Sequence, residues 1–450
     1  MAADILPECL IHKILSFLSF KEATRVSLLC KTWLQAWLTL PWLKFKYPKA
    51  NMDNIMERYK KEKIPIEKFE LSAYYSDSYQ VYPLIDKWLD VALDNGLKYL
   101  VFDVSKFSLP IFRILSVNTL TELFLDSCDI KCSSSSLSSM VICPSLTKLS
   151  LIRVRLDENM LQSLLNSCPM IVSFVCEFCY GLENVELLNL RNIKSVSIRG
   201  LTSVSDITGG VHINIQAPTL EHLSCSSFLL LTCDVIKCEN LKSLHLSNMN
   251  DCCNGFLENL ISSSSQSLKV LKVWDCQRIL EIDSPNLESL EYMGCHIPKL
   301  KIATELKHSK IDLQYFDNIN TAWFGELRMF LSNSTSWSQV SIDFWGCSAI
   351  DVEKLGLEHR GCYYTTPQVD VLNVNIRPQN NEVCPSFVDA LLRSCHPKRL
   401  NLQASIEMIT WFISCLMGIK NSSSHSTSYI GKPGHRQLKE VKSFDGENQE

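Results

Sequence analysis

The residues of this 450-residue chain most suited to chemistry are its 20 cysteines. Cys176 and Cys179 form a Cys-x-x-Cys pair, a spacing found in redox-active sites and in half of a zinc site. No second pair of this kind exists to complete a tetrahedral site, and Cys225 to Cys238 and Cys252-Cys253 lack metal-ligand spacing with any histidine. We therefore interpret the pair as core packing, which free cysteine does well.

Other catalytic patterns are missing from the sequence. It contains no Gly-x-x-x-x-Gly-Lys-Ser/Thr phosphate loop and no Gly-x-Ser-x-Gly nucleophile elbow. The ten histidines are scattered, and acidic pairs such as Asp157-Glu158 fall where helices are expected to start. The sequence thus predicts a non-catalytic protein with no catalytic residue, no cofactor and no metal site.

Composition narrows the class of protein further. Apolar residues make up 46% and charged residues 20% of the chain, as in ordinary globular proteins. A net charge of −4 gives no general attraction to nucleic acid or to an anionic membrane. The longest apolar run, 408–419, is too short to span a bilayer. With no secretory signal and many cysteines, we expect reduced thiols and an intracellular location, in the cytoplasm, the nucleus or both.

A repeat with apolar residues at relative positions 0, 3, 5 and 8 organises the chain from about residue 66 onward. It is clearest in Leu120/Leu123/Leu125/Cys128 and in Leu241/Leu244/Leu246/Met249. Successive copies start roughly 25 residues apart, which is typical of leucine-rich repeats. The pattern predicts an α/β fold: a leucine-rich-repeat solenoid, or horseshoe, with parallel strands on its concave face. Cys176 and Cys179 occupy the five- and eight-spaced core positions of one copy.

Repeat regularity falls toward the C-terminus. We expect regular repeats over 66–300 and degenerate repeats over 301–420, with copies that start at Trp337, Val369 and Pro397. No frame fits 306–320. The segment 408–417 has the character of a last apolar helix, and 421–450 is expected to be a mobile tail.

Residues between the core positions of each strand should point to the concave face. Apolar groups there stand where a solvated strand would carry polar ones, which makes them candidate anchors for a bound protein. The alternative is that the C-terminal region or a neighbouring loop covers them. The candidate substrate-binding residues are Phe124, Ile152, His245, Lys272 and Trp274.

The first forty residues have a different character. Asp4 and Pro7 favour a helix start, and Leu10, Ile14 and Leu18 recur at helical spacing. A second helix is predicted over 21–29 and a third over 33–38, which Pro41 ends. Three helices this short bury too little surface to be stable alone. Their apolar faces need a partner, either the rest of the chain, as a cap on the repeats, or another protein.

The order of residues in this segment resembles the F-box. The motif is carried by Leu6-Pro7-Glu8, by Ile14-Leu15-Ser16-Phe17-Leu18 and by 27–33, Ser-Leu-Leu-Cys-Lys-Thr-Trp. Two positions depart from it, since Ser19 replaces the usual Pro and Leu29 the usual Val. The resemblance implies docking onto a Skp-type adaptor, and through it a cullin, in an SCF ubiquitin ligase. The implied contact set, part of which must instead form a small internal core, is Leu6, Pro7, Leu10, Ile14, Leu15, Leu18, Ser27, Cys30, Lys31 and Trp33.

Along its whole length the chain resembles plant F-box/leucine-rich-repeat proteins, and His435 to Val441 resembles the closing strand of their FBD region. The expected divisions are an F-box over 1–45, a helical linker over 46–65, repeats over 66–300, degenerate repeats over 301–420 and a tail with an FBD-like end over 421–450. The resemblance implies a substrate-recognition subunit of an SCF-type E3 ubiquitin ligase.

Two alternatives remain at this stage. A repeat scaffold outside any ligase would satisfy the N-terminal apolar faces internally. A small-molecule co-receptor would need a dense Lys/Arg floor, which the concave positions do not supply.

Overall fold

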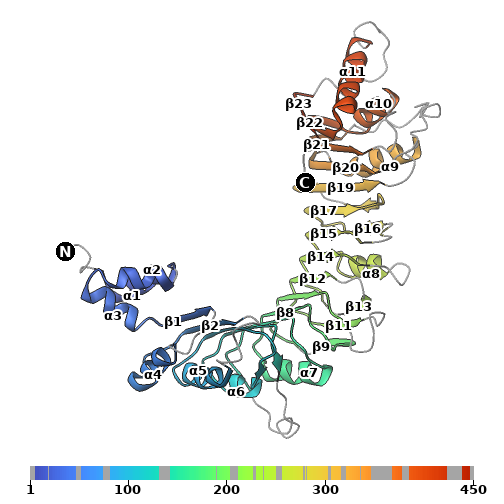
Figure 1. Cartoon of the computed structure of the whole chain (residues 1–450). Coiled ribbons are helices and arrows are strands. Elements are labelled where there is room, and N and C mark those ends of the chain that lie inside the picture. Colours follow the sequence, from blue (N-terminus) through green and yellow to red (C-terminus); the bar gives the residue numbers. More distant parts are fainter. Residues whose placement is uncertain are drawn as a thin grey trace. The chain divides into compact units, whose positions relative to one another are not determined.

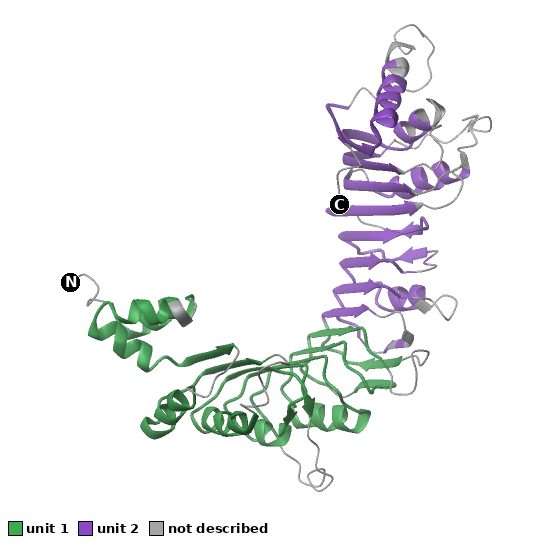
Figure 2. Cartoon of the chain, in the orientation of Figure 1, with its two compact units in different colours: residues 1–220 green, residues 221–450 purple. Residues whose placement is uncertain are grey.

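The computed structural model describes most of the chain. The described residues are 6–18, 20–46, 52–73, 82–130, 142–188, 190–202, 211–226, 230–236, 238–249, 256–276, 279, 281–302, 306–315, 321–334, 336–345, 367–377, 385–422 and 438–445. They form two compact units, residues 1–220 and 221–450 (Figure 2). None of the described helices is long and apolar enough to cross a bilayer.

Unit 1 begins with the three predicted short helices (Figure 1). They are α1 (Glu8–Ser16), α2 (Phe20–Ser27) and α3 (Lys31–Leu38). Pro7 stands at the N-cap of α1, where its missing N–H costs no hydrogen bond. Asp4, the expected cap, lies outside the described residues.

The repeats of unit 1 supply seven described parallel strands to the main sheet. In spatial order they are β1 (Trp42–Lys46), β2 (Lys68–Ala73), β3 (Tyr99–Val104), β5 (Glu122–Asp126), β7 (Lys148–Ile152), β8 (Ser173–Glu177) and β10 (Ser195–Arg199). Because the pattern alternates, Phe69, Leu100 and Leu123 are buried while their neighbours in sequence face the other side. The parallel sheet expected from the repeat is confirmed.

Helices and short strands form the return segments between these strands. Figure 1 shows the helices of these return segments along one face of the sheet. The helices are α4 (Asp53–Glu62), α5 (Tyr82–Asp94), α6 (Ile111–Leu115) and α7 (Glu158–Ser167). The short strands are β4 (Ser108–Leu109), β6 (Asp129–Ile130), β9 (Asn184–Leu188) and β11 (Val211–Gln216). Asp157 caps α7, since its Oδ1 accepts from the Met160 N–H at 2.8 Å.

A left-handed residue follows the strand in several repeats, immediately before the eight-spaced apolar position. Ser127, Arg153 and Phe178 have φ values of 56°, 50° and 54°. The turn brings the next side chain, such as Cys128, back into the core that the strand has just lined. At Gly200 (φ 56°) a Cβ would lie 2.6 Å from the Phe178 ring, so glycine lets that ring stay in place.

Unit 2 also consists largely of parallel strands, and two of its described strands form a separate two-stranded sheet. Its strands are β12 (His222–Ser226), β13 (Leu230–Ile236), β14 (Ser243–Ser247), β15 (Val270–Trp274), β16 (Glu281–Asp283), β17 (Ser289–Gly294), β18 (Lys299–Lys301), β19 (His308–Tyr315), β20 (Ser336–Trp345), β21 (Gln368–Arg377), β22 (His396–Ala404) and β23 (Glu440–Asp445). Its helices are α8 (Phe256–Ser263), α9 (Thr321–Leu331), α10 (Pro385–Ser394) and α11 (Ile406–Ser422).

In the C-terminal part of the chain, the structure contains the predicted repeat copies and the last helix, and it also contains a strand that was not predicted. The copies that start at Trp337, Val369 and Pro397 lie in strands β20, β21 and β22, and the last apolar helix is α11. The segment without a frame contains β19, whose Ile311 and Leu313 pair with Val340 and Ile342 of β20. Of the predicted closing strand, 435–437 lie outside the described residues; the described strand begins at Glu440, with Val441 opposite Leu400 and Ser443 opposite Leu402. Much of the expected mobile tail, 423–437, lies outside the described residues.

Helix α4 joins the N-terminal helices to the repeats. Tyr59 donates its hydroxyl to the Leu40 carbonyl at 2.7 Å, just beyond α3. At the other end of α4, Asp53 accepts from Trp88 Nε1 at 2.9 Å and from Lys87 Nζ at 3.0 Å, both on α5. These contacts hold the linker between two elements that are far apart in sequence.

Asp53→Ala is expected to lower the unfolding free energy by about 1–3 kcal/mol at pH 7, because it leaves the buried Trp88 N–H without an acceptor. The hydrogen bonds from Lys87 and Trp88 lower the pKa of Asp53 below its usual 3.8. Its contribution is therefore present above pH 3.8 and is lost as pH falls through the lowered folded-state pKa. Urea unfolding at pH 7 and pH 3 measures this.

The control is Asp86→Ala, at an exposed position of α5, which should change the unfolding free energy little. Equal effects of the two substitutions would contradict the role given to Asp53.

Candidate functional site

The three N-terminal helices enclose a small core of their own. Ile11, Leu15, Ala23, Trp33 and Ala36 are buried together. Polar contacts tie the helices at one side: His12 Nε2 lies 2.9 Å from the Ala36 carbonyl, and Thr39 donates its hydroxyl to Glu8 Oε1 at 2.9 Å. The arrangement fixes which apolar side chains are left to face outward.

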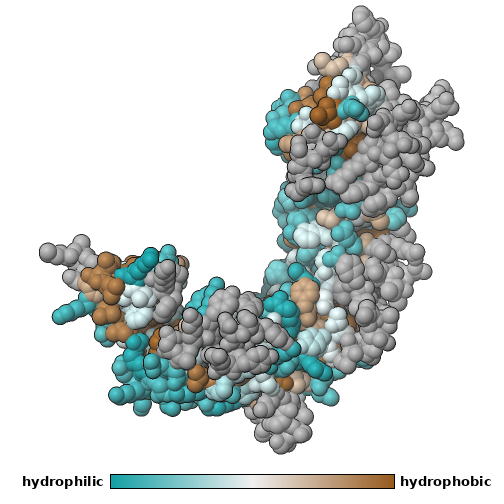
Figure 3. Space-filling model, viewed as in Figure 1, coloured by the Kyte–Doolittle hydropathy of each residue, from teal (hydrophilic) through white to brown (hydrophobic). Residues whose placement is uncertain are grey.

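A set of large apolar side chains remains on the surface of these helices, which we call the F-box apolar surface (Figure 3). None of the described residues covers them. Phe17, Leu28 and Leu29 are the most exposed, at 76%, 78% and 66%. The full set is Leu6, Leu10, Ile14, Phe17, Leu28, Leu29 and Leu34. Exposed apolar side chains in such number on so small a domain are typical of a protein interaction site.

The ten residues implied by the F-box resemblance divide by burial. Leu6, Pro7, Leu10, Ile14 and Lys31 are exposed, Leu18 and Cys30 are half-buried, and Leu15, Ser27 and Trp33 are buried. Leu15 and Trp33 belong to the internal core, and the buried Ser27 hydroxyl donates to the Thr24 carbonyl at 2.7 Å.

Four exposed apolar residues were absent from that set: Phe17, Leu28, Leu29 and Leu34. A signal for one pair existed in the sequence. Leu28 and Leu29 follow Ser27, the last residue of α2, and because consecutive side chains point in different directions, at least one of the two was to be expected on the surface.

On the outward face of the unit 1 sheet, Phe124 lies between Val101 of β3 and Ser150 of β7. It lines a shallow hollow of about 550 Å³ together with Trp42, Tyr99 and Lys148. Lys148 forms an ion pair with Glu122 at 2.7 Å, so the hollow combines aromatic walls with paired charges. Ile152 lies on the same face of β7, two residues beyond Ser150, where it is half-buried and pairs with Asp126 of β5. It does not line this hollow.

The other three candidate substrate-binding residues lie together in unit 2. The His245 and Trp274 rings meet edge to face with centroids 4.6 Å apart. Lys272 Nζ lies 5.9 Å from the Trp274 ring centroid and 2.7 Å from Glu291 Oε1. Trp274 is 36% exposed, so its ring is accessible to a partner. The neighbouring Lys272 charge is balanced by Glu291.

The Cys-x-x-Cys pair is part of the repeat core. Cys176 and Cys179 are both fully buried, and the Cys179 thiol donates to the Leu151 carbonyl with a 3.4 Å separation. The neighbouring Cys179 thiol and burial raise the pKa of Cys176 well above its usual value, which disfavours a thiolate at Cys176. Within the described ranges, no three His, Cys, Asp or Glu side chains gather as metal ligands.

Comparison with known families agrees with this geometry. Residues 4–45 match the model of the F-box domain. Residues 85–236 match the model of the leucine-rich repeats of the FBD-associated F-box protein At5g56370.

Curated relatives come from Arabidopsis thaliana. The chain is 25% identical over 268 residues to F-box/FBD/LRR-repeat protein At2g26030, covering 54% of this chain and 57% of that protein. It is 27% identical over 276 residues to F-box/LRR-repeat protein 13, covering 55% and 58%. The chain spans between about half and three fifths of the length of the first curated relatives it matches. The protein thus combines an F-box domain with leucine-rich repeats of the FBD-associated type, and its homologues are plant F-box/LRR and F-box/FBD/LRR proteins.

Proposed function

We propose that this protein is the substrate-recognition subunit of an SCF-type E3 ubiquitin ligase. Its F-box would dock onto a Skp-type adaptor, which links it to a cullin, and its repeats would bind the protein to be ubiquitinated. The observation that carries the proposal is the F-box apolar surface, which stays exposed in a domain whose internal core is already complete.

A repeat scaffold outside a ligase would be expected to cover these side chains with its own residues. Leu10, Phe17, Leu28 and Leu29 instead remain 49% to 78% exposed with respect to the described chain. Because apolar burial is worth about 25 cal/mol per Å², a partner that covered this surface would gain substantial affinity. This favours an adaptor-bound protein over a free-standing one.

The mechanism requires no catalytic residue in this chain. Tethering a substrate beside the ubiquitin-loaded conjugating enzyme raises the effective concentration of the substrate lysine, so that attack becomes intramolecular. The candidate substrate anchors are Phe124 and Ile152 on unit 1, and His245, Lys272 and Trp274 on unit 2. The protein would act inside the cell, in the cytoplasm or the nucleus.

A pull-down of the full chain with a purified Skp-type adaptor tests the proposal. We expect the wild type to bind and Leu6→Ala/Pro7→Ala to bind at least about tenfold more weakly, since two exposed apolar contacts are lost. Circular dichroism checks that α1 persists in the variant.

The matched control is Ile142→Ala/Pro144→Ala, because these two exposed residues carry the same side-chain classes on the repeats. It should bind the adaptor like the wild type. A folded wild-type chain that does not bind the adaptor would overturn the proposal and leave the N-terminal helices as a cap on a repeat protein.

A further inference from the structure

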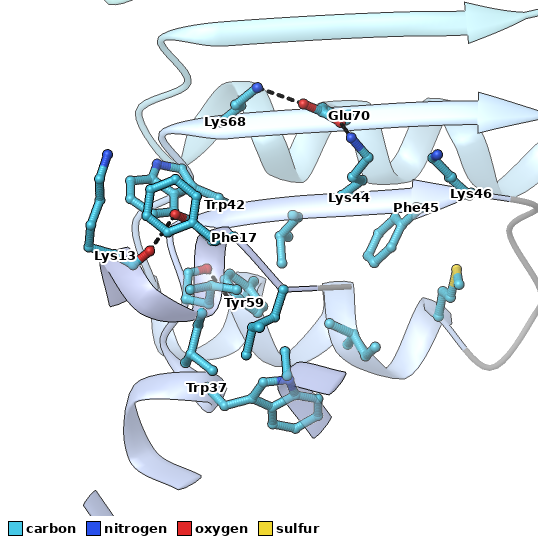
Figure 4. A pocket seen from close by; sticks show the side chains of 18 of the residues that line it. Lys13, Phe17, Trp37, Trp42, Lys44, Phe45, Lys46, Tyr59, Lys68 and Glu70 are labelled. Carbon is cyan, nitrogen blue, oxygen red and sulfur yellow. Dashed lines mark hydrogen bonds and ion pairs between the residues drawn. The ribbon is translucent and has the colours of Figure 1, made fainter. Parts of the chain in front are cut away.

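A second hollow of unit 1 lies between the N-terminal helices, strand β1 and helix α4 (Figure 4). Its volume of about 710 Å³ falls within the range of binding sites. It is lined by every residue of β1, namely Trp42, Leu43, Lys44, Phe45 and Lys46. The F-box side contributes Phe17, Leu18 and Leu40, and α4 contributes Ile55 and Tyr59.

The lining by five consecutive strand residues places the hollow along the edge of β1. Alternate side chains of a strand point to opposite faces of the sheet, so only a space beside the edge can touch all of them. One edge of β1 is paired with β2. No strand among the described residues pairs with the other, outer edge.

The backbone hydrogen bonds indicate which groups face this outer edge. The Pro41 carbonyl accepts from the Glu67 and Lys68 N–H groups at 2.9 and 3.1 Å, across the β1–β2 pair. In a parallel ladder, alternate residues direct their N–H and C=O toward opposite neighbours. Pro41, Leu43 and Phe45 therefore face β2, while the main-chain groups of Trp42, Lys44 and Lys46 are directed outward. An edge of this kind is a template for an added strand.

The two faces beside the edge differ in chemistry. On one face Leu43 and Phe45 are 7% and 2% exposed, with the Phe45 ring in T-shaped contact with Phe69 at 5.8 Å. On the other face Lys44 and Lys46 are exposed. In Figure 4 their ammonium groups and the Phe45 ring lie on opposite sides of the strand.

The charge of the lining is strongly positive. The cations are Lys13, Lys44, Lys46, Lys68 and Arg58, and the lining contains one carboxylate, that of Glu70. Lys44 and Lys68 share that carboxylate, and the Lys68–Glu70 distance is 2.6 Å. Lys46 forms no ion pair with any described residue. An occupant with negative groups on the lysine face would therefore complement the lining.

We propose that the outer edge of β1 accepts an extended segment of a partner protein as an added strand, with acidic side chains alternating with apolar ones. The acidic side chains would face Lys44 and Lys46, and the apolar ones would enter the hollow between Phe45 and the N-terminal helices. Main-chain hydrogen bonds supply affinity in strand addition, and the alternate side chains supply specificity. Five strand residues at about 3.3 Å each match a segment of about five or six residues. The inference does not depend on the ligase role.

The test uses the full chain without adaptor and a (Leu-Asp)₃-amide peptide with fluorescein on its N-terminus, and binding is measured by fluorescence anisotropy at low salt. We expect binding by the wild type and about tenfold weaker binding by Lys44→Gln/Lys46→Gln, which removes two charge contacts. Lys60→Gln/Lys61→Gln is the matched control: both lysines are exposed on α4, outside the hollow, and the charge change is the same.

Two further peptides separate strand addition from mere charge attraction. A peptide N-methylated at every residue cannot donate to the strand edge and should not bind, and a peptide with Lys in place of Asp should be repelled. Hydrogen exchange should slow in 42–46 when the first peptide binds. Absence of wild-type binding, equal binding by the N-methylated peptide, or unchanged exchange in 42–46 would each overturn the proposal.

Discussion

A chain that carries Leu28→Glu and Leu29→Glu is expected to lose adaptor affinity by at least about a hundredfold while it keeps its fold. In the wild type these side chains are 78% and 66% exposed, so the substitutions remove little internal contact. Burying two leucines at an interface is worth about 1.5–3 kcal/mol each, and two carboxylates in their place would add a desolvation cost. Titration calorimetry with a purified Skp-type adaptor measures the affinity, and thermal unfolding should give an unchanged midpoint.

Two controls make this result specific. Ile142→Glu/Met170→Glu introduces the same charges at apolar residues of the repeats that are 49% and 48% exposed, and should bind like the wild type. Trp33→Ala, at a 7% exposed position of the helical core, should lose binding together with helical signal. Wild-type affinity in the Leu28/Leu29 variant would show that the F-box apolar surface is not the contact.

Phe69→Ala should destabilise unit 1 by about 3–5 kcal/mol, whereas Phe124→Ala should cost less than about 1 kcal/mol. Both phenylalanines lie on strands of the same sheet. Phe69 is fully buried and its ring packs against Phe45, while Phe124 is half-buried on the opposite face. Urea unfolding followed by tryptophan fluorescence would measure both.

Because the Phe124→Ala chain should fold normally, it also tests whether the outward face of the sheet binds the substrate. We expect this variant to lose substrate binding and to keep adaptor binding. Equal destabilisation by the two substitutions would contradict the assignment of faces. Leu246→Ala, at a fully buried position of β14 in unit 2, checks that a core substitution in the other unit is also detected.

The repetitive part of the fold could be predicted from the sequence because its contacts are local and periodic. A residue such as Leu123 or Phe174 is buried by its place in a strand of alternating pattern, and each strand packs beside the next copy of the same pattern. The interpretation of Cys176 and Cys179 as core residues rested on the same periodicity, and both are buried. Prediction weakened where the period did: β19 was not expected, because Ser309 occupies the three-spaced core position, opposite Leu290, where the regular copies carry an apolar residue.

The division within the F-box, by contrast, was decided by tertiary structure. The motif contains Leu15 and Ile14 alike, yet Leu15 is buried and Ile14 is exposed. Three short helices can bury only one stripe each, and the angle at which they pack selects that stripe. The sequence by itself thus determined the F-box, the repeats and the lack of catalytic motifs. Only the packing of α1, α2 and α3 against one another, and of α4 beside the edge of β1, decided which apolar and charged side chains remain available to partners.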